Sequence, residues 1–139
     1  MADPLAPPPG FTPHFRKSPL TDPWEPLWSR RDANGFAIGL WLAEPHCNAG
    51  GFAHGGLIAT LADNAMGLAC ALSADKLGGL VTVSLSIDYL GSAKIGDWLE
   101  IAARPIRLGG TLAFAEAGVT VGESAVARAS AVFRVLAPA

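Results

Sequence analysis

The sequence predicts an α+β domain in which an antiparallel β-sheet wraps around one long central α-helix. The first observation is the run from Leu57 to Leu72, where small or aliphatic residues occupy nearly every side, as is typical of a buried helix. The second is a series of period-two segments after this run, which indicates antiparallel strands. A sheet with only one buried helix must curve around it to cover its apolar circumference.

Length and composition fit a single domain. The chain has 139 residues, of which 50% are hydrophobic, enough for one core without disulfides. Only 16% of residues are charged and the net charge is -2, so no basic face for nucleic acid is expected. A small domain with so few charges and so many hydrophobic residues is expected to have some apolar surface, which another copy of the chain would most simply cover. We expect a homo-oligomer, at least a dimer, and a tetramer as a dimer of dimers.

The two cysteines and the chain start bear on location. Cys47 and Cys70 form no framework pattern and are interpreted as reduced thiols, with Cys70 in the core. The first ten residues have neither a basic nor an apolar signal-peptide region. No uninterrupted apolar run approaches the roughly 20 residues that span a bilayer. We therefore expect a soluble, cytoplasmic protein without a membrane partner.

Residues 1–26 are predicted to form an extended arm, followed by a single domain over 27–139. The arm holds eight of the eleven prolines, which exclude a regular helix or a central strand. Its aromatic residues Phe11, Phe15 and Trp24 argue against a purely solvated tail. The arm is expected to lie over the domain or over a neighbouring subunit, with His14 at its surface.

The domain is expected to begin with a hairpin and a helix. Residues 27–31 and 36–43 suit short strands, and the Asp-Ala-Asn-Gly segment 32–35 between them is typical of a hairpin turn. Pro45 ends the second strand, and a glycine-rich loop leads to a helix start near His54 or Gly55. This helix is expected to end within 73–76, before the glycines at 78 and 79.

Four alternating segments follow the helix and are expected to form a meander. In the first, Val83, Leu85, Ile87 and Tyr89 alternate with Thr82, Ser84, Ser86 and Asp88. The other segments are 98–107, 112–121 and 125–136, and glycine-containing turns separate them. No internal repeat is present.

Residues 46–67 join a polar, glycine-rich loop to the helix and contain the candidate site. An unpaired carboxylate among apolar residues is costly, so Asp63 needs a functional or hydrogen-bonding reason. The loop and helix contain Asn48, then Gly51, then His54-Gly55-Gly56, then Asp63, separated by two, two and six residues. In this order and spacing they resemble the hotdog-fold acyl-CoA thioesterases of the PaaI-like branch, which act on phenylacetyl-type and fatty acyl-CoA thioesters. The resemblance extends through the strand 82–89 and the turn 91–97, and covers roughly residues 27–136.

The resemblance implies roles for individual residues. Asp63 would be the catalytic carboxylate, acting as general base on water or as nucleophile, and the Gly55 amide would polarise the thioester carbonyl. Asn48 and His54 would shape this site. Thr82 occupies the position at which some relatives have a serine that helps to place the water. Residues expected to contact the substrate are Gly56, Asn64, Met66 and Phe52. No cofactor is expected.

The residue chemistry supports these roles but leaves alternatives. Backbone amides at a helix N-terminus are preorganised donors for an oxyanion, and glycine admits a ligand close to the backbone, although Gly55 and Gly56 could simply allow tight packing. Asp63 could be a structural carboxylate bonded to amides or to Asn64. For His54 a positioning role is favoured over proton transfer, and Asn48 could equally be a turn former.

Spacing adds one requirement. Asp63 lies eight residues beyond Gly55, so the two are about 12 Å apart along one helix and cannot act on the same carbonyl in one chain. If both are catalytic, each site combines Gly55 of one subunit with Asp63 of another, and a two-fold axis supplies two such sites.

Other sites are less favoured. A structural zinc site needs four ligands at recognised spacings, and this stretch of the sequence offers only His46, Cys47 and His54, so no metal is expected. Cys47 as nucleophile would need an adjacent histidine to lower its thiol pKa. His46 is next in sequence, but neighbouring side chains on an extended loop point apart. Trp41 and Trp98 are further candidates for an acyl pocket. CoA phosphates could meet surface cations, of which the candidates are Lys94, Arg104, Arg107, Arg128 and Arg134.

Two other functions stay open beside thioester hydrolysis. A hotdog enoyl-CoA hydratase or dehydratase needs a histidine paired with an acid, but His46 lies seventeen residues before Asp63, which does not resemble the spacing of that branch. A non-catalytic acyl-CoA-binding or sensing domain would not need the carboxylate.

Overall fold

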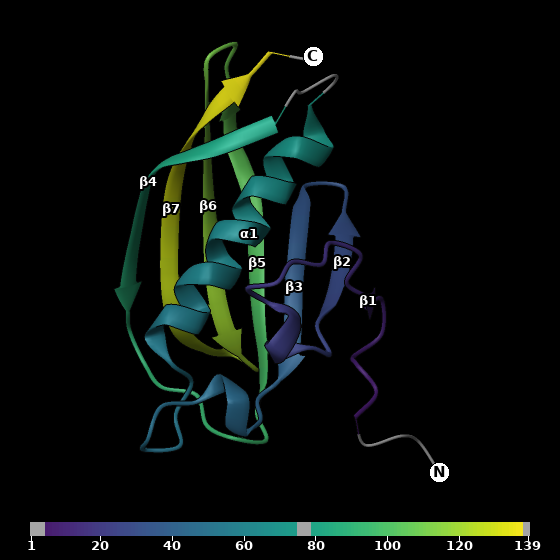
Figure 1. Ribbon diagram of the computed structural model, residues 1–139, viewed down its shortest axis with the longest axis vertical. Helices are drawn as coiled ribbons and strands as arrows, with labels where there is room; N and C mark the ends of the chain where they lie inside the picture. The colour runs from purple at the N-terminus through teal and green to yellow at the C-terminus, as the bar shows by residue number, and fades with distance from the viewer. Residues whose placement is uncertain (1–4, 75–78, 138–139) are drawn as a thin grey trace.

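The computed structural model describes residues 5–74 and 79–137. Within these residues the chain forms one seven-stranded antiparallel sheet with one α-helix on it (Figure 1), which confirms the predicted fold class. The strand order is β1-β2-β3-β5-β6-β7-β4. The strands are β1 (Thr12–Pro13), β2 (Trp28–Asp32), β3 (Gly35–Trp41), β4 (Gly79–Tyr89), β5 (Trp98–Leu108), β6 (Leu112–Val121) and β7 (Ser124–Leu136); the helix is α1 (Gly55–Ser73), and η1 (Asp22–Trp24) and η2 (Glu44–His46) are 3-10 turns.

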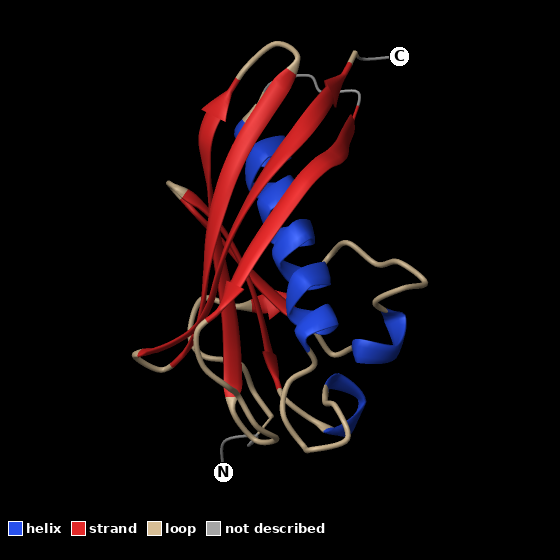
Figure 2. Ribbon diagram, turned by 90° about the vertical axis from the view of Figure 1, so that its left-hand side faces the viewer, coloured by secondary structure: helices blue, strands red, loops and turns tan. Residues whose placement is uncertain are grey.

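Helix α1 packs along one face of the curved sheet (Figure 2). The apolar residues that face the sheet recur at helical spacing and are buried: Leu57, Ile58, Leu61, Ala62, Ala65, Met66, Ala69 and Cys70. By length and hydropathy alone α1 could cross a membrane, but here it is the core helix of the domain. Its opposite side, which includes Asp63, is only half-buried. The expectation of a helix buried on every side is therefore wrong for a single chain, because the sheet covers one face only.

The expected four-stranded meander is corrected by the strand order. Strands β5, β6 and β7 do pair in sequence order, but β4 pairs with β7 and not with β5, because β5 takes its other neighbour from β3 of the first hairpin. Strand β4 thus becomes an edge of the sheet, at the left of Figure 1. Val81, Val83 and Tyr89 on this edge are 50%, 60% and 52% exposed. A long, apolar, unpaired edge is a template for another strand.

A β-bulge in β4 changes which residues face the helix. Thr82 pairs with Phe133 and Ser84 with Val132, so Val83 has no partner in β7. A strict alternation would place Thr82 and Tyr89 on opposite faces. One extra residue reverses this relation, so Thr82 lies on the helix-facing side together with Tyr89.

The arm folds onto its own domain. Strand β1 extends the sheet edge by pairing with β2, and Phe11 packs edge-to-face on Trp98 with 5.2 Å between ring centroids. The indole nitrogen of Trp41 donates to the carbonyl of Ala6 at 3.1 Å. His14 is buried beside Phe36, which corrects its expected place at the surface.

The buried His14 predicts an acid-sensitive arm. Burial lowers the pKa of His14 below its ordinary value of 6.5, and the charge of Glu25 only partly opposes this. The unfolded chain therefore binds a proton more readily, so stability is complete above the unfolded pKa and is lost as pH falls below it. We expect Tm to fall more steeply between about pH 7.5 and pH 5.5 for the wild type than for His14→Gln. Parallel profiles for the two proteins would contradict this.

Candidate active site

The loop before α1 is built by Asn48. Its side-chain oxygen accepts hydrogen bonds from the backbone amides of Gly50 at 2.9 Å and Phe52 at 3.2 Å, which is the turn-forming role of asparagine. Gly51 has a φ of +85°, a conformation that favours glycine. The residues between Asn48 and His54 thus form a turn that the Asn48 side chain closes and that leads directly into the helix.

His54 caps the helix. Its Nδ1 accepts a hydrogen bond from the Gly56 amide at 2.8 Å, so the Gly56 amide is occupied. Gly55 is the first residue of α1, and within the described residues its amide has no hydrogen-bond acceptor. Unpaired amides at this end of a helix, where the dipole is positive, attract developing negative charge. The geometry therefore leaves Gly55, and not Gly56, as an available donor, and gives His54 a positioning role.

Asp63 is held by Thr82. The Thr82 hydroxyl donates to Asp63 Oδ1 at 2.7 Å, across from β4 to the half-buried side of α1. No described residue donates to Asp63 Oδ2, so this oxygen can accept from water or substrate. The bond exists because the bulge at Val83 turns Thr82 toward the helix.

Tyr89 is a site residue that sequence reasoning missed. Its hydroxyl donates to the Gly55 carbonyl oxygen at 2.6 Å. The alternation of β4 placed Tyr89 on an apolar face, but no sequence signal showed that it reaches the start of the helix. Tyr89 and Thr82 belong to one strand, so β4 contacts both the Gly55 and the Asp63 regions of α1.

His46 has a structural role that the sequence did not indicate. It is buried, and its Nδ1 accepts from the Ala43 amide at 2.9 Å. This requires the proton on Nε2, which then donates to the Trp24 carbonyl at 2.8 Å. The His46 carbonyl in turn accepts from the His54 amide at 3.0 Å. The arm is thereby tied to the helix cap.

The other predicted substrate contacts divide into surface and core. Phe52 is 45% exposed in the loop, and Asn64 is half-buried next to Asp63. Met66 is fully buried in the core, so in this chain it faces the sheet and not an open site. A shallow cleft of about 390 Å³ lies at the helix start and is lined by Trp24, Pro45, His46, Cys47, His54, Gly56 and Leu57.

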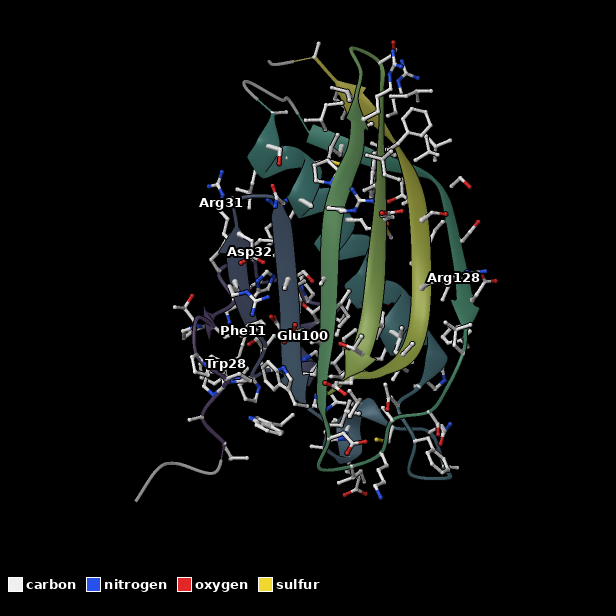
Figure 3. All side chains as sticks on the ribbon, turned by 180° about the vertical axis from the view of Figure 1, so that it is seen from behind. Phe11, Trp28, Arg31, Asp32, Glu100 and Arg128 are labelled. Carbon is white, nitrogen blue, oxygen red and sulfur yellow. The ribbon has the colours of Figure 1, made fainter. Side chains whose placement is uncertain are left out.

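The thiols and the surface cations have other surroundings. Burial raises the pKa of Cys70 to about 11 and also raises that of Cys47, which disfavours a thiolate nucleophile. Among the residues that the structure describes, no three potential metal ligands gather. Arg128 pairs with Asp88 at 2.9 Å on the sheet face away from the helix (Figure 3), and Arg104 pairs with Glu116. Both ion pairs are exposed to solvent.

Gly55 and Asp63 remain far apart in one chain. Helix α1 is continuous over both residues, so the rise per residue separates them by about 12 Å. A donor and a carboxylate at this separation cannot contact one carbonyl group. Within one chain, these two predicted groups therefore do not form one site.

Comparison with known proteins identifies the family of the chain. The family model of the thioesterase superfamily matches residues 50–135. A candidate esterase of Pseudomonas aeruginosa is 48% identical over 127 residues, which are 91% of this chain and 95% of that protein. Human acyl-coenzyme A thioesterase 13 is 40% identical over 79 residues, 57% of this chain and 56% of that protein.

Solved structures give the same result. Zebrafish thioesterase superfamily member 2 has a TM-score of 0.73 and 31% identity, covering 78% of this chain and 80% of that chain. A Streptococcus mutans protein bound to acetyl-CoA has a TM-score of 0.69 and 32% identity, covering 76% and 83%. The chain therefore belongs to the thioesterase superfamily, has the hotdog fold and is a thioester hydrolase.

Proposed function

We propose that this protein is an acyl-CoA thioesterase of the PaaI-like branch, which hydrolyses an acyl- or aryl-acyl-CoA to the free acid and CoA. The observation that carries the proposal is the Thr82–Asp63 hydrogen bond, which orients a carboxylate and leaves its second oxygen open. The acetyl-CoA bound to the Streptococcus mutans relative and the name of the human relative support CoA as the carrier.

In the proposed reaction the Gly55 amide stabilises the developing negative charge, and Asp63 activates water or is itself the nucleophile. Asp63 removes a proton from water as the water oxygen attacks the thioester carbonyl, and the carbonyl oxygen becomes an oxyanion that the Gly55 amide stabilises. The intermediate collapses, the C–S bond breaks, and the proton held by Asp63 passes to the CoA thiolate. Alternatively Asp63 attacks the carbonyl itself, the C–S bond breaks as the CoA thiolate leaves, and water hydrolyses the resulting anhydride to the free acid and the Asp63 carboxylate.

The proposed site lies between two subunits. Gly55 of one subunit and Asp63 of its partner would meet at one thioester, because about 12 Å of helix separates them within a chain. The exposed edge of β4 and the half-buried side of α1 are surfaces that a second copy would cover. We further propose that such dimers pair into tetramers and that the enzyme is cytoplasmic.

The hydroxyl of Thr82 gives a specific prediction. Thr82→Val removes the bond to Asp63 while keeping the shape of the side chain, and we expect kcat to fall about tenfold, the equivalent of one hydrogen bond to a charged group. Thr82→Ser should stay within a few-fold of the wild type. Ser86→Ala, which removes a hydroxyl from the opposite face of β4, is the matched control. A Thr82→Val enzyme with wild-type kcat would show that this bond has no catalytic role.

A substrate screen tests the activity itself. Purified protein is assayed with aryl, short-chain and long-chain acyl-CoA thioesters, with release of free CoA as the readout, and enoyl-CoA hydration is followed in parallel. We expect thioester hydrolysis, with kcat lowered about 10²–10⁴-fold in Asp63→Asn. Hydration in place of hydrolysis, or tight acyl-CoA binding without turnover, would replace the proposal by one of the two alternative functions.

A further inference from the structure

We propose that Tyr89 is a positioning residue that fixes the direction of the Gly55 amide, and that it acts on turnover through the backbone. The proposal rests on the proposed function, in which this amide stabilises the oxyanion. The contact is the hydrogen bond of 2.6 Å from the Tyr89 hydroxyl to the Gly55 carbonyl oxygen.

The peptide group between Gly55 and Gly56 is held at both ends. Its carbonyl oxygen accepts from Tyr89, and its amide donates to His54 Nδ1 at 2.8 Å. The preceding peptide, which carries the Gly55 amide, is held by the bond of 3.2 Å from the Ile58 amide to the His54 carbonyl. The torsion angles of Gly55 are therefore fixed between two anchored peptides.

This anchoring matters because residue 55 is a glycine in the first turn of a helix. Glycine restricts its own backbone less than any other residue, and a terminal turn has few hydrogen bonds of its own. An oxyanion donor is effective only when its direction is set before the reaction. Tyr89 supplies from β4 the restraint that the glycine lacks.

Tyr89 also explains the glycine itself. Gly55 is not among the glycines with positive φ, so its backbone conformation does not require glycine. A Cβ atom at this position would lie 3.3 Å from both Cζ and the hydroxyl oxygen of Tyr89, tighter than ordinary contact. The missing side chain at residue 55 therefore makes room for the tyrosine.

The bulge at Val83 brings the two halves of this arrangement onto one strand face. Thr82 and Tyr89 are separated by seven positions and would face opposite sides of a regular strand. With Val83 unpaired, both face the helix, where one contacts Asp63 and the other Gly55. Strand β4 thus positions both groups of the proposed chemistry.

The test is a comparison of Tyr89→Phe with Thr60→Val. Tyr89→Phe removes only the hydroxyl, whereas Thr60→Val removes a similar bond of 2.9 Å to the carbonyl of Gly56, whose peptide does not flank the Gly55 amide. We expect Tyr89→Phe to lower kcat about tenfold, less than the loss of an entire oxyanion donor, with KM and Tm close to wild type. Thr60→Val should keep wild-type kcat.

A second variant pair tests whether Tyr89 acts through Gly55. Gly55→Pro deletes the amide at a helix position that accepts proline, and Gly55→Ala, which adds the same Cβ beside Tyr89 but keeps the amide, is its control for crowding. If Tyr89 works only by aiming this amide, Tyr89→Phe should cause no further loss of kcat in the Gly55→Pro background. A full tenfold loss in that background would overturn the proposal.

Two other results would overturn the positioning role. A higher KM with unchanged kcat in Tyr89→Phe would mean that Tyr89 contacts the substrate directly. An equal loss of kcat in Thr60→Val would mean that the whole helix start has loosened. If Tyr89→Phe is fully active while Asp63→Asn is inactive, this inference fails and the proposed function stands. If the wild type hydrolyses no thioester, both fail.

Discussion

Replacing Asp63 with asparagine is expected to lower kcat for acyl-CoA hydrolysis by about 10²–10⁴-fold, the range that a positioned general base contributes. Asparagine keeps the shape of the side chain and can still accept the Thr82 bond, but it cannot take a proton from water or attack a carbonyl. Because the side chain is half-buried and keeps its partner, Tm should change little. Steady-state kinetics and thermal unfolding measure the two effects separately.

Asp88→Asn is the matched control for this prediction. Asp88 is an exposed carboxylate on the outer face of β4, where its ion pair with Arg128 contributes little to stability. The kcat of the Asp88→Asn enzyme should stay within twofold of wild type. Oxygen-18 incorporation into Asp63 during a single turnover in labelled water would identify nucleophilic attack, with water opening the anhydride at the Asp63 carbonyl. Wild-type kcat in Asp63→Asn would end the role of this carboxylate.

Mixed dimers of two inactive variants are expected to regain activity. Gly55→Pro lacks the oxyanion donor and should lose about 10²–10³-fold in kcat, while its helix persists because proline suits the first helical position. When an Asp63→Asn subunit pairs with a Gly55→Pro subunit, one of the two shared sites has both groups intact. Dimers purified through two different tags should then show about half the wild-type kcat per dimer.

The arrangement within the dimer is tested by the complementary pairing. A wild-type subunit is combined with a subunit that carries both Gly55→Pro and Asp63→Asn. If each site draws on two subunits, neither site is intact and the dimer should be inactive. If each site lies within one chain, this dimer should have half of the wild-type activity and the first mixed dimer should have none. The two pairings therefore give opposite results for the two arrangements.

Local patterns were sufficient to predict most elements. The Asp-Ala-Asn-Gly turn joins β2 and β3, where Asp32 pairs with Gly35, and α1 begins at Gly55 and ends at Ser73 as expected. The predicted break at position 78 lies outside the described residues. Strands β5, β6 and β7 start and end within one residue of their expected bounds. These features follow from turn chemistry, capping and side-chain period, all of which act between near neighbours in the chain.

Contacts between distant segments were predicted less well. The burial of His14 depends on Phe36 lying beside it, and nothing near His14 in the sequence indicates that neighbour. The place of β4 next to β7 goes with the pairing of β5 with β3, which leaves β5 no free edge for β4. The tetramer, the cytoplasmic location and the CoA-binding cations stay predictions.

The sequence by itself determined the fold class, the helix start at Gly55 and the separation of Gly55 from Asp63, because a helix has a fixed rise and a glycine-rich turn has a local signature. The tertiary structure alone decided that Thr82 holds Asp63 and that Tyr89 holds the Gly55 peptide. The physical reason is the bulge at Val83: one unpaired residue leaves the alternation of the sequence unchanged but reverses the face of every residue beyond it.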